Sequence, residues 1–332
     1  MLIMKKVFAK AAFILLCGLA ACNPHKSDME LETMNYELVE RLTEFPDSTF
    51  FTEITHAEYE NGRIYLMDKK RGDLVALTED FKQIECIAPH SEIDLVMPIA
   101  FTVWQDTVYI CDEGSINTLK VYTKGKQISS LSSVRFYEKR MAVNNTALYT
   151  TFPTDSSCYL KINRHDTEKR AYEGKVVKEE NERRTIMKNE KHLFLNNGIL
   201  YTVAECYPYI DSYNAKTGKW IKNLDISHIP VIQSNISFIE SQPVEPKSYY
   251  VYMEDGDIHN NFLYLLCASL GDNNNYRCNT LLKVDVSNED MKPVGYYELP
   301  GRFYTAICVS DNYLYAIYSD KDCAIEKYKL KQ

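Results

Sequence analysis

A short motif recurs six times along this chain and limits the folds that it can adopt. A turn residue is followed by an apolar residue, a tyrosine and then a further apolar residue or threonine, as in NNGILYTV at positions 196–203. Asn-Gly or Asp/Asn turns between apolar runs indicate β-hairpins. Each copy therefore predicts the first two strands of a repeated unit. Successive tyrosines are 44, 40, 52, 63 and 51 residues apart: Tyr65, Tyr109, Tyr149, Tyr201, Tyr264 and Tyr315.

Two further strands follow the hairpin in most units. A third, alternating strand is expected after each tyrosine, as at Leu119–Tyr122, and a fourth after a short polar turn, as at Trp220–Leu224. Four strands per unit at this period are typical of propeller blades. We therefore predict an all-β fold, a six-bladed β-propeller of four-stranded antiparallel blades. The blades are expected near residues 51–97, 98–139, 140–190, 191–248, 249–303 and 304–332.

The sixth unit ends at Gln332 just after its third strand, so its fourth strand is missing. An open ring would leave an exposed edge strand that invites aggregation. The segment Tyr36–Leu42, within 36–44, alternates well enough to supply that strand, which makes 36–332 the propeller domain. Helical spacing of Leu31, Leu38, Val39 and Leu42 leaves a short helix as the alternative. Each motif tyrosine is expected to fill the gap between blades while its hydroxyl finds a polar partner.

The N-terminus predicts where the chain is located. A basic start precedes an eleven-residue apolar run, Ala11–Ala21, which is too short to span a bilayer but fits a secretory signal peptide over residues 1–21. The run ends Leu19-Ala20-Ala21-Cys22, which resembles a bacterial lipobox. That resemblance implies cleavage before Cys22 and a lipid such as palmitate on its thiol. Residues 22–35 would then tether the fold to a membrane of the bacterial cell envelope, with the membrane and leaflet open. The other reading is an ordinary signal peptide with a chance cysteine.

The net charge and the positions of the cysteines restrict the possible functions only weakly. Removal of residues 1–21 takes away three lysines and no acid, so the formal net charge moves from −8 to −11. This disfavours nucleic acid and anionic headgroups as partners. Eight cysteines follow Cys22, mostly inside apolar strands, where we expect small buried hydrophobes. Disulfides are the alternative, with Cys267 and Cys278 the best pair.

Taken together, the chain resembles six-bladed propeller lipoproteins of the TolB-like and NHL-like kind. In its predicted fold the resemblance covers Tyr36–Gln332, and in its signal for export and lipidation it covers Met1–Cys22. Many unrelated functions use this fold, and members of such families are mostly uncharacterised, so little function follows from it.

Candidate binding residues lie in two places. Acids recur in the loops between second and third strands and are candidates to ring one channel mouth, although Asp is also a common turn residue. The second place is the apolar insertion 226–247, with Ile232 and Phe238, which either presents a partner surface or packs on its own blade. The linker 174–190 is a charge run, expected as a solvated loop or short helix. The recurring acids are Asp68, Asp112, Asp155, Glu205, Asp272 and Asp320.

Enzyme motifs such as GxSxG, HExxH and a phosphate loop are absent from the sequence. His56 and His192 are expected in first strands, where both can face the channel. Two functions follow: a non-catalytic binding or scaffold module for a protein, peptide or glycan, or a propeller hydrolase or lactonase with a metal in its channel. The sequence favours the first, as a monomer without a cofactor. A channel Ca²⁺ has no supporting motif, since the loop 271–277 lacks the spacing of a known calcium site.

Overall fold

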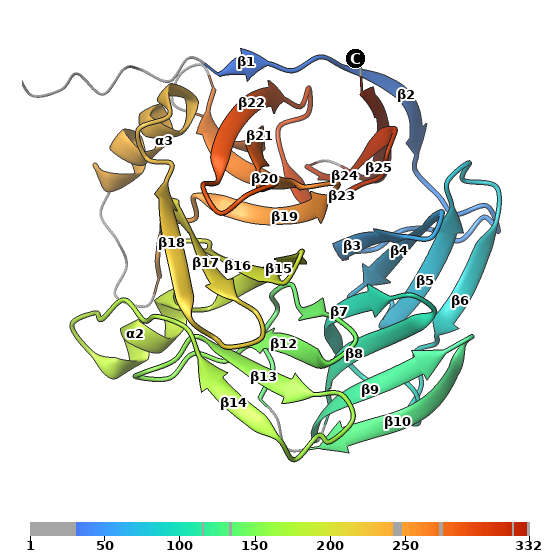
Figure 1. The fold of residues 1–332 in the computed structure, drawn as a ribbon. Coiled ribbons are helices and arrows are strands. Elements are labelled where there is room, and N and C mark those ends of the chain that lie inside the picture. Colours follow the sequence, from blue (N-terminus) through green and yellow to red (C-terminus); the bar gives the residue numbers. More distant parts are fainter. Residues whose placement is uncertain are drawn as a thin grey trace, which may run out of the picture. The chain divides into compact units, whose positions relative to one another are not determined.

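The computed structural model describes residues 31–114, 116–132, 135–241, 248–271, 275–320 and 322–330. These residues form six sheets, each with four antiparallel strands, arranged in a ring (Figure 1). The prediction of an all-β, six-bladed propeller is confirmed. The signal peptide and Cys22 lie outside the described residues.

The first three blades follow one another directly along the chain. The first hairpin of blade one turns at Asn61 and Gly62, which both have positive φ, 51° and 79°, and that of blade two turns at Gln105 and Asp106, where Gln105 has a φ of 56°. This conformation suits tight turns between twisted strands. The strands are β3 (Ile54–Glu60), β4 (Arg63–Asp68), β5 (Asp73–Thr78) and β6 (Ile84–Ala88); β7 (Pro98–Trp104), β8 (Thr107–Glu113), β9 (Asn117–Thr123) and β10 (Lys126–Ser132); β11 (Ala142–Val143), β12 (Ala147–Thr151), β13 (Tyr159–Asn163) and β14 (Arg170–Glu173).

Blades four and five are each preceded by a longer connection that contains a helix, whereas blade six follows blade five directly. Helix α2 (Glu182–Lys188) precedes blade four and α3 (Pro230–Glu240) precedes blade five. The strands are β15 (Lys191–Asn196), β16 (Ile199–Ala204), β17 (Tyr209–Asn214) and β18 (Trp220–Asp225); β19 (Met253–His259), β20 (Phe262–Leu270), β21 (Tyr276–Asp285) and β22 (Lys292–Glu298); β23 (Tyr304–Val309), β24 (Tyr313–Ser319) and β25 (Cys323–Leu330).

An N-terminal strand closes the ring. β2 (Tyr36–Leu42) pairs antiparallel with β25 and so supplies the missing outer strand of blade six. The alternative of a short helix in this segment is wrong, because the open edge of β25 offers it a full ladder of backbone hydrogen bonds. Within the segment expected as tether, β1 (Glu32–Thr33) pairs parallel with β22 as a fifth strand of blade five.

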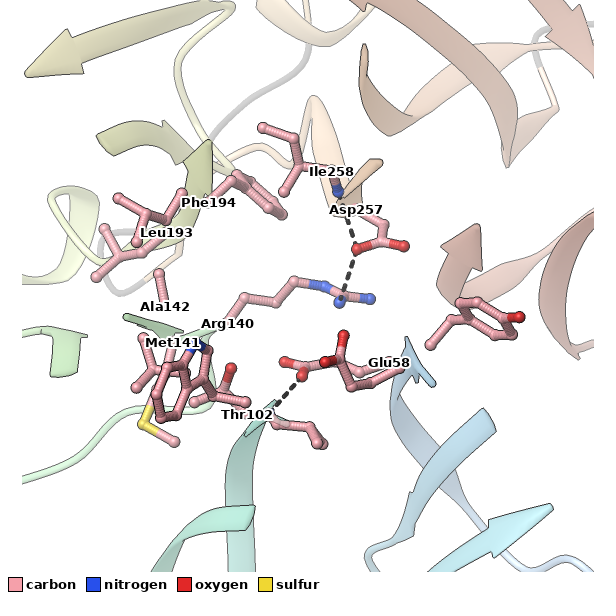
Figure 2. Close-up of a pocket in the computed structure, with 15 residues that line it drawn as sticks. Glu58, Thr102, Arg140, Met141, Ala142, Leu193, Phe194, Asp257 and Ile258 are labelled. Carbon is pink, nitrogen blue, oxygen red and sulfur yellow. Dashed lines mark hydrogen bonds and ion pairs between the residues drawn. The ribbon is translucent and has the colours of Figure 1, made fainter. Parts of the chain in front are cut away.

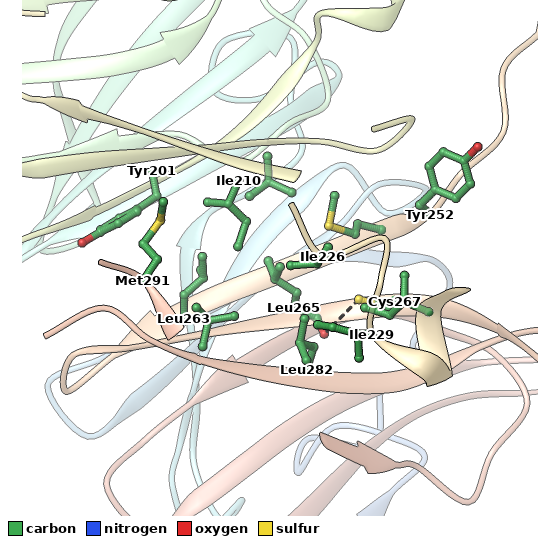
Figure 3. Packing of buried hydrophobic residues seen from close by; sticks show 14 of the residues in the cluster. Tyr201, Ile210, Ile226, Ile229, Tyr252, Leu263, Leu265, Cys267, Leu282 and Met291 are labelled. Carbon is green, nitrogen blue, oxygen red and sulfur yellow. Dashed lines mark hydrogen bonds between the residues drawn. The ribbon is translucent and has the colours of Figure 1, made fainter. Parts of the chain in front are cut away.

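The motif tyrosines are buried between blades, as expected. Four of their hydroxyls hydrogen-bond to the following blade, just after its third strand. Tyr149 donates to Ala215 O at 2.8 Å and Tyr201 to Val286 O at 3.3 Å. Figure 3 shows Tyr201 beside Met291 and near Ile210 in this packing. The exposed fractions confirm the packing role: Tyr65 6%, Tyr109 7%, Tyr149 1%, Tyr201 0%, Tyr264 4% and Tyr315 0%.

The cysteines behave mostly as buried hydrophobes. Cys267 packs in the cluster shared with blade four, whereas Cys278 packs in the cluster shared with blade six. Their side chains therefore leave the sheet of blade five on opposite faces and are not paired. The two helices of the described residues, α2 and α3, are too short to cross a membrane.

Candidate functional site

The first strands of the blades surround a central channel that contains a cavity of about 220 Å³. Most of its lining comes from the second halves of these strands, near their hairpins, and Arg140 and Met141 join it from just before β11 (Ala142–Val143), so it lies toward the hairpin end of the channel. Figure 2 shows Arg140 reaching toward Asp257 and Glu58, with Phe194 and Met141 among the apolar residues beside it. The lining is thus partly charged and partly apolar, as in many ligand sites.

Strand periodicity explains why charged groups line the channel. Alternate residues of a strand point to the same side, so β3 presents His56, Glu58 and Glu60 together, and β19 presents Asp255 and Asp257. Their carboxylates accept hydrogen bonds from backbone N–H groups of the next blade. Glu58 Oε2 accepts from Val103 N–H at 2.7 Å, and Asp257 Oδ2 accepts from Val309 N–H at 2.7 Å.

Arg140, which lies just before β11, is the central cation of the channel and is 2% exposed. It binds Asp255 with two hydrogen bonds, of 2.5 Å from Nε and 2.7 Å from Nη2, and Nη2 also donates to Ile307 O. Burial disfavours its charge, but the charges of Asp255, Asp257 and Glu58 outweigh this and raise the pKa of Arg140. A bidentate pair of this kind fixes the guanidinium in one orientation.

Two acids beside Arg140 are less well compensated. Burial raises the pKa of Glu58 to about 8, although the charge of Arg140 and the Val103 N–H act in the opposite direction. Burial likewise raises the pKa of Asp257 to about 6, against the charge of Arg140 and the N–H of Val309. At neutral pH Glu58 is therefore largely protonated and Asp257 largely ionised.

A second polar cluster lies at the end of the channel where second and third strands are joined. Glu205 accepts from Lys139 Nζ at 2.5 Å and from the Tyr249 hydroxyl at 2.9 Å, and lies 3.4 Å from His192 Nε2. Burial opposes ionisation of Glu205, but the hydrogen bonds and charges of His192 and Lys139 lower its pKa to about 2. His192 Nδ1 is 3.9 Å from Asp255 Oδ1, so this histidine links the two clusters.

The recurring acids do not act as one ring. Asp68 accepts hydrogen bonds from the backbone of Thr52, Glu53 and Arg71, and so holds the loop that enters blade one. Asp112 does the same for Val96 and Met97, and also binds Lys120. Both carboxylates are buried and fully used within their own blade or its entry loop.

The remaining recurring acids have different surroundings. Asp155 and Asp320 are exposed in their loops, and Asp272 lies outside the described residues. Of the recurring acids that the structure describes, only Glu205 joins a channel cluster. Of the predicted histidines, both His56 and His192 are buried in the channel, 6% and 7% exposed.

The apolar insertion forms α3 and packs against blades four and five. Ile232 is 1% exposed and Phe238 is half-buried, and both contact the same cluster as Leu265 and Tyr201. Figure 3 shows Ile229, just before α3, against Cys267 and Leu282. The packing alternative therefore accounts for the described part of the insertion, 226–241.

Sequence reasoning missed Arg140, Glu58 and Asp257 as one constellation. Asp255 and Asp257 were visible as an alternating acidic pair on a first strand, and Glu58 and Glu60 form the same pattern in blade one. What marks such pairs is charge at alternate positions of an inner strand, which is unusual because that strand is surrounded by protein.

A metal-dependent hydrolase or lactonase would need several ligands to converge. In the described ranges, no three His, Cys, Asp or Glu side chains are grouped closely enough to hold a metal ion. The position between the channel acids is instead taken by the Arg140 guanidinium.

Comparisons with known proteins identify the fold alone. No family model matches the chain, and no curated protein matches it. Among solved structures, a Bacteroides fragilis protein that is described as exported has a TM-score of 0.58 and 11% sequence identity to this chain. The match covers 91% of this chain and 98% of that one. A member of the DUF4221 family from Bacteroides vulgatus gives 0.53 at 12% identity, covering 91% and 100%. A protein of unknown function from Bacteroides thetaiotaomicron also gives 0.53 at 12%, covering 91% and 73%.

Proposed function

We propose that this protein is a lipid-anchored binding module of the bacterial cell envelope, whose propeller takes the end of a peptide, protein or glycan into the channel cavity. The observation that carries the proposal is the cavity itself. It is a concave space of about 220 Å³ whose charged groups are held in place by hydrogen bonds to neighbouring blades. Its volume suits a terminal group rather than a whole drug-sized ligand.

The anchoring part of the proposal rests on the N-terminal sequence. Lysines, an apolar run and Leu19-Ala20-Ala21-Cys22 agree with lipidation at Cys22. Replacement of Cys22 by Ser is expected to remove incorporation of labelled palmitate and to shift the protein from the membrane fraction to the soluble fraction. Cys17→Ser, inside the apolar run, is the matched control and should leave both unchanged. Equal membrane retention of the Cys22→Ser variant would contradict the anchor.

The binding part is tested by blocking the cavity. The full chain in detergent is titrated by calorimetry with tripeptides that have free ends and with mono- and disaccharides. Ile258 is half-buried in the cavity wall, so Ile258→Trp should fill the space and abolish binding. Ile128 on β10 is 64% exposed, so Ile128→Trp is the matched control and should bind as the parent does.

Melting curves of both variants establish that they are folded. Binding that survives in a folded Ile258→Trp variant would exclude the cavity as the site. Failure of every compound in the panel to bind the parent would remove the binding function proposed for the channel.

A further inference from the structure

Large apolar side chains are exposed together at one end of the ring. Within the described ranges ten such side chains are exposed, and five of the ten lie on the outer strands β2, β10, β14 and β18. The other five lie in loops of blades one and two, at the end where second and third strands are joined and each blade is entered. A group of this kind marks an interaction surface. We call it the apolar loop patch, with these exposed fractions: Phe50 70%, Ile93 86%, Val96 44%, Met97 41% and Ile116 64%.

Contacts between the loops make this patch continuous. The loop 69–72 of blade one donates a hydrogen bond to Phe50 O at 3.4 Å, and the same loop packs against the entry loop of blade two, 89–97. In blade two, Val96 packs against Gly114, which begins the loop between β8 and β9. The five side chains therefore belong to one surface.

Two of the recurring acids fix the conformation of these loops. Asp68 accepts hydrogen bonds of 2.7 and 3.0 Å from two N–H groups in the entry loop of blade one. Asp112 accepts hydrogen bonds of 3.0 and 2.7 Å from the N–H groups of Val96 and Met97. Both carboxylates are buried, so they hold the two entry loops from below and present the patch in a fixed conformation.

The same loops bury other apolar residues. The rings of Phe45 and Phe51 pack edge to face with their centres 4.4 Å apart, and Leu95 is fully buried. These residues form part of the core, whereas Phe50 and Ile93 from the same loops remain in water. Exposed apolar surface is unfavourable, so its fixed presentation indicates a partner that buries it.

The charges around the patch do not favour an anionic partner. Lys70 pairs with Glu53 at 3.1 Å and Lys69 pairs with Glu138 at 2.6 Å, while Glu92, beside Ile93, is exposed. These charges are of both signs and give no net attraction for a negative surface. Burial of apolar side chains is therefore the main force that this face can supply.

The form of the patch favours a lipid surface over a folded protein. Its side chains come from three separate loops rather than from one groove. A fluid bilayer accepts apolar side chains in any arrangement, whereas a protein partner needs a surface of complementary shape. Phe is also one of the residues that enter the boundary between headgroups and acyl chains.

The distance along the chain to Cys22 allows the patch to reach a membrane. β1 pairs with Gly295 and Tyr296, near the middle of the seven-residue strand β22. Leu31, just before β1, is therefore about 12 Å along the strand direction from either end of the blade. Nine residues separate Leu31 from Cys22, and they span about 30 Å when extended. Either end of the ring can thus lie on the bilayer, and the patch distinguishes the two ends.

We propose that the apolar loop patch inserts into the surface of a zwitterionic bilayer. The lipid on Cys22 and the patch then hold the propeller in one orientation, with the hairpin end, toward which the cavity lies, directed away from the membrane. The inference rests on the lipid anchor of the proposed function and adds this orientation. Because the anchor keeps the fold close to the bilayer, weak insertion is sufficient.

The test uses the full chain, purified in detergent and reconstituted into phosphatidylcholine vesicles. Ile93→Trp places a fluorophore in the patch, and lipids with brominated acyl chains quench tryptophan that enters the bilayer. The added fluorescence of Ile93→Trp is expected to fall by roughly twofold or more in brominated vesicles. Ile128→Trp, at an exposed position of β10 outside the patch, is the matched control and should not be quenched. Melting curves of both variants establish that they are folded.

Further variants assign the quenching to the patch. In the Ile93→Trp background, Phe50→Ser combined with Ile116→Ser should remove most of it. Leu38→Ser combined with Val39→Ser, two exposed apolar residues of the outer strand β2, is the control and should leave it unchanged.

Equal quenching of Ile93→Trp and Ile128→Trp, or quenching that persists after the patch serines, would overturn the proposal. A dimer in detergent that Ile93→Ser dissociates in sedimentation would overturn it too, because a second copy would then cover the patch. Labelled palmitate on Cys22 without quenching of Ile93→Trp would leave the anchor standing and refute only the insertion. A chain without palmitate would remove the anchor and this inference together.

Discussion

At the scale of the residue, the motif tyrosine connects each blade to the next. Tyr149, Tyr201 and Tyr315 donate to groups that follow the third strand of the next blade, and Arg164 donates from the same position to Tyr109. Tyr315 donates to Glu79 of blade one, so the same contact also joins the last blade to the first. The phenol ring fills the space between sheets and its hydroxyl satisfies a carbonyl or side chain that would otherwise be buried without a partner.

Tyr149→Phe tests this contact. Its hydroxyl donates a 2.8 Å hydrogen bond to Ala215 O, so the variant should lower the free energy of unfolding by about 1 kcal/mol. Tyr172→Phe is the control. Tyr172 is 56% exposed, so removal of its hydroxyl should change the free energy of unfolding little. The measurement is urea unfolding monitored by fluorescence. Equal stability of Tyr149→Phe and the parent would show that packing alone accounts for this tyrosine.

At the scale of the element, α3 shows how an apolar insertion is used as packing. The helix starts with Pro230 at its first turn and turns Ile232, Ile236 and Ile239 onto blades four and five. Pro at the first turn costs no hydrogen bond, since those N–H groups have no partner inside the helix. The same buried face also contains Asn235, which is 0% exposed and whose side-chain nitrogen and oxygen have no hydrogen-bond partner among the described residues.

Asn235→Leu should therefore stabilise the protein. The change removes two unsatisfied buried polar atoms and adds a good helix former of similar size, for an expected gain of about 1–2 kcal/mol in the free energy of unfolding. Gln233→Leu, an exposed position of the same helix, is the control for helix propensity alone. Thermal unfolding followed by circular dichroism measures both. A lower melting temperature for Asn235→Leu would show that Asn235 has a polar partner in the native protein.

At the scale of the whole molecule, the ring brings acids from blades that are far apart in sequence into one channel. Glu58 of blade one, Arg140 before blade three and Asp257 of blade five meet there. Because the first strands exclude water, these acids titrate above their usual range, and burial raises the pKa of Glu254 to about 7 as well. The stability of the propeller should therefore depend on pH near neutrality.

The sign of this dependence follows from Glu58. Between its usual pKa of about 4.5 and its folded value of about 8, the folded state keeps a proton that the unfolded state has lost. The free energy of unfolding should thus fall as pH rises from 5 to 8, by at most about 1.4 kcal/mol per pH unit for this one group.

Glu58→Gln cannot lose that proton, so its stability should decrease less over the same pH range. Urea unfolding at pH 5, 6.5 and 8 measures the difference, with Glu85→Gln as the exposed control. Parallel pH profiles of the parent and Glu58→Gln would contradict the raised pKa.

Local sequence was sufficient for the blades, whereas for the closing segment it left a strand and a short helix as alternatives. Asn-Gly turns, period-two alternation and the spacing of the tyrosines are short-range properties, and the missing fourth strand of blade six required a partner for β25. Whether Tyr36–Leu42 formed a helix or a strand depended on that distant edge, which only the closed ring provides.

The channel constellation depended on the tertiary structure. Asp68 and Asp112 lie three residues after their motif tyrosines and Glu205 lies four after its own, and the first two bind backbone N–H groups whereas the third binds Lys139 and His192. Glu58 and Asp257 share one repeat position, each paired with the motif tyrosine of its own blade, whereas Arg140 does not, and the three are separated by 82 and 117 residues along the chain. They meet because the ring places the first strands around one axis, and their raised pKa values arise from burial that no local pattern of the sequence records.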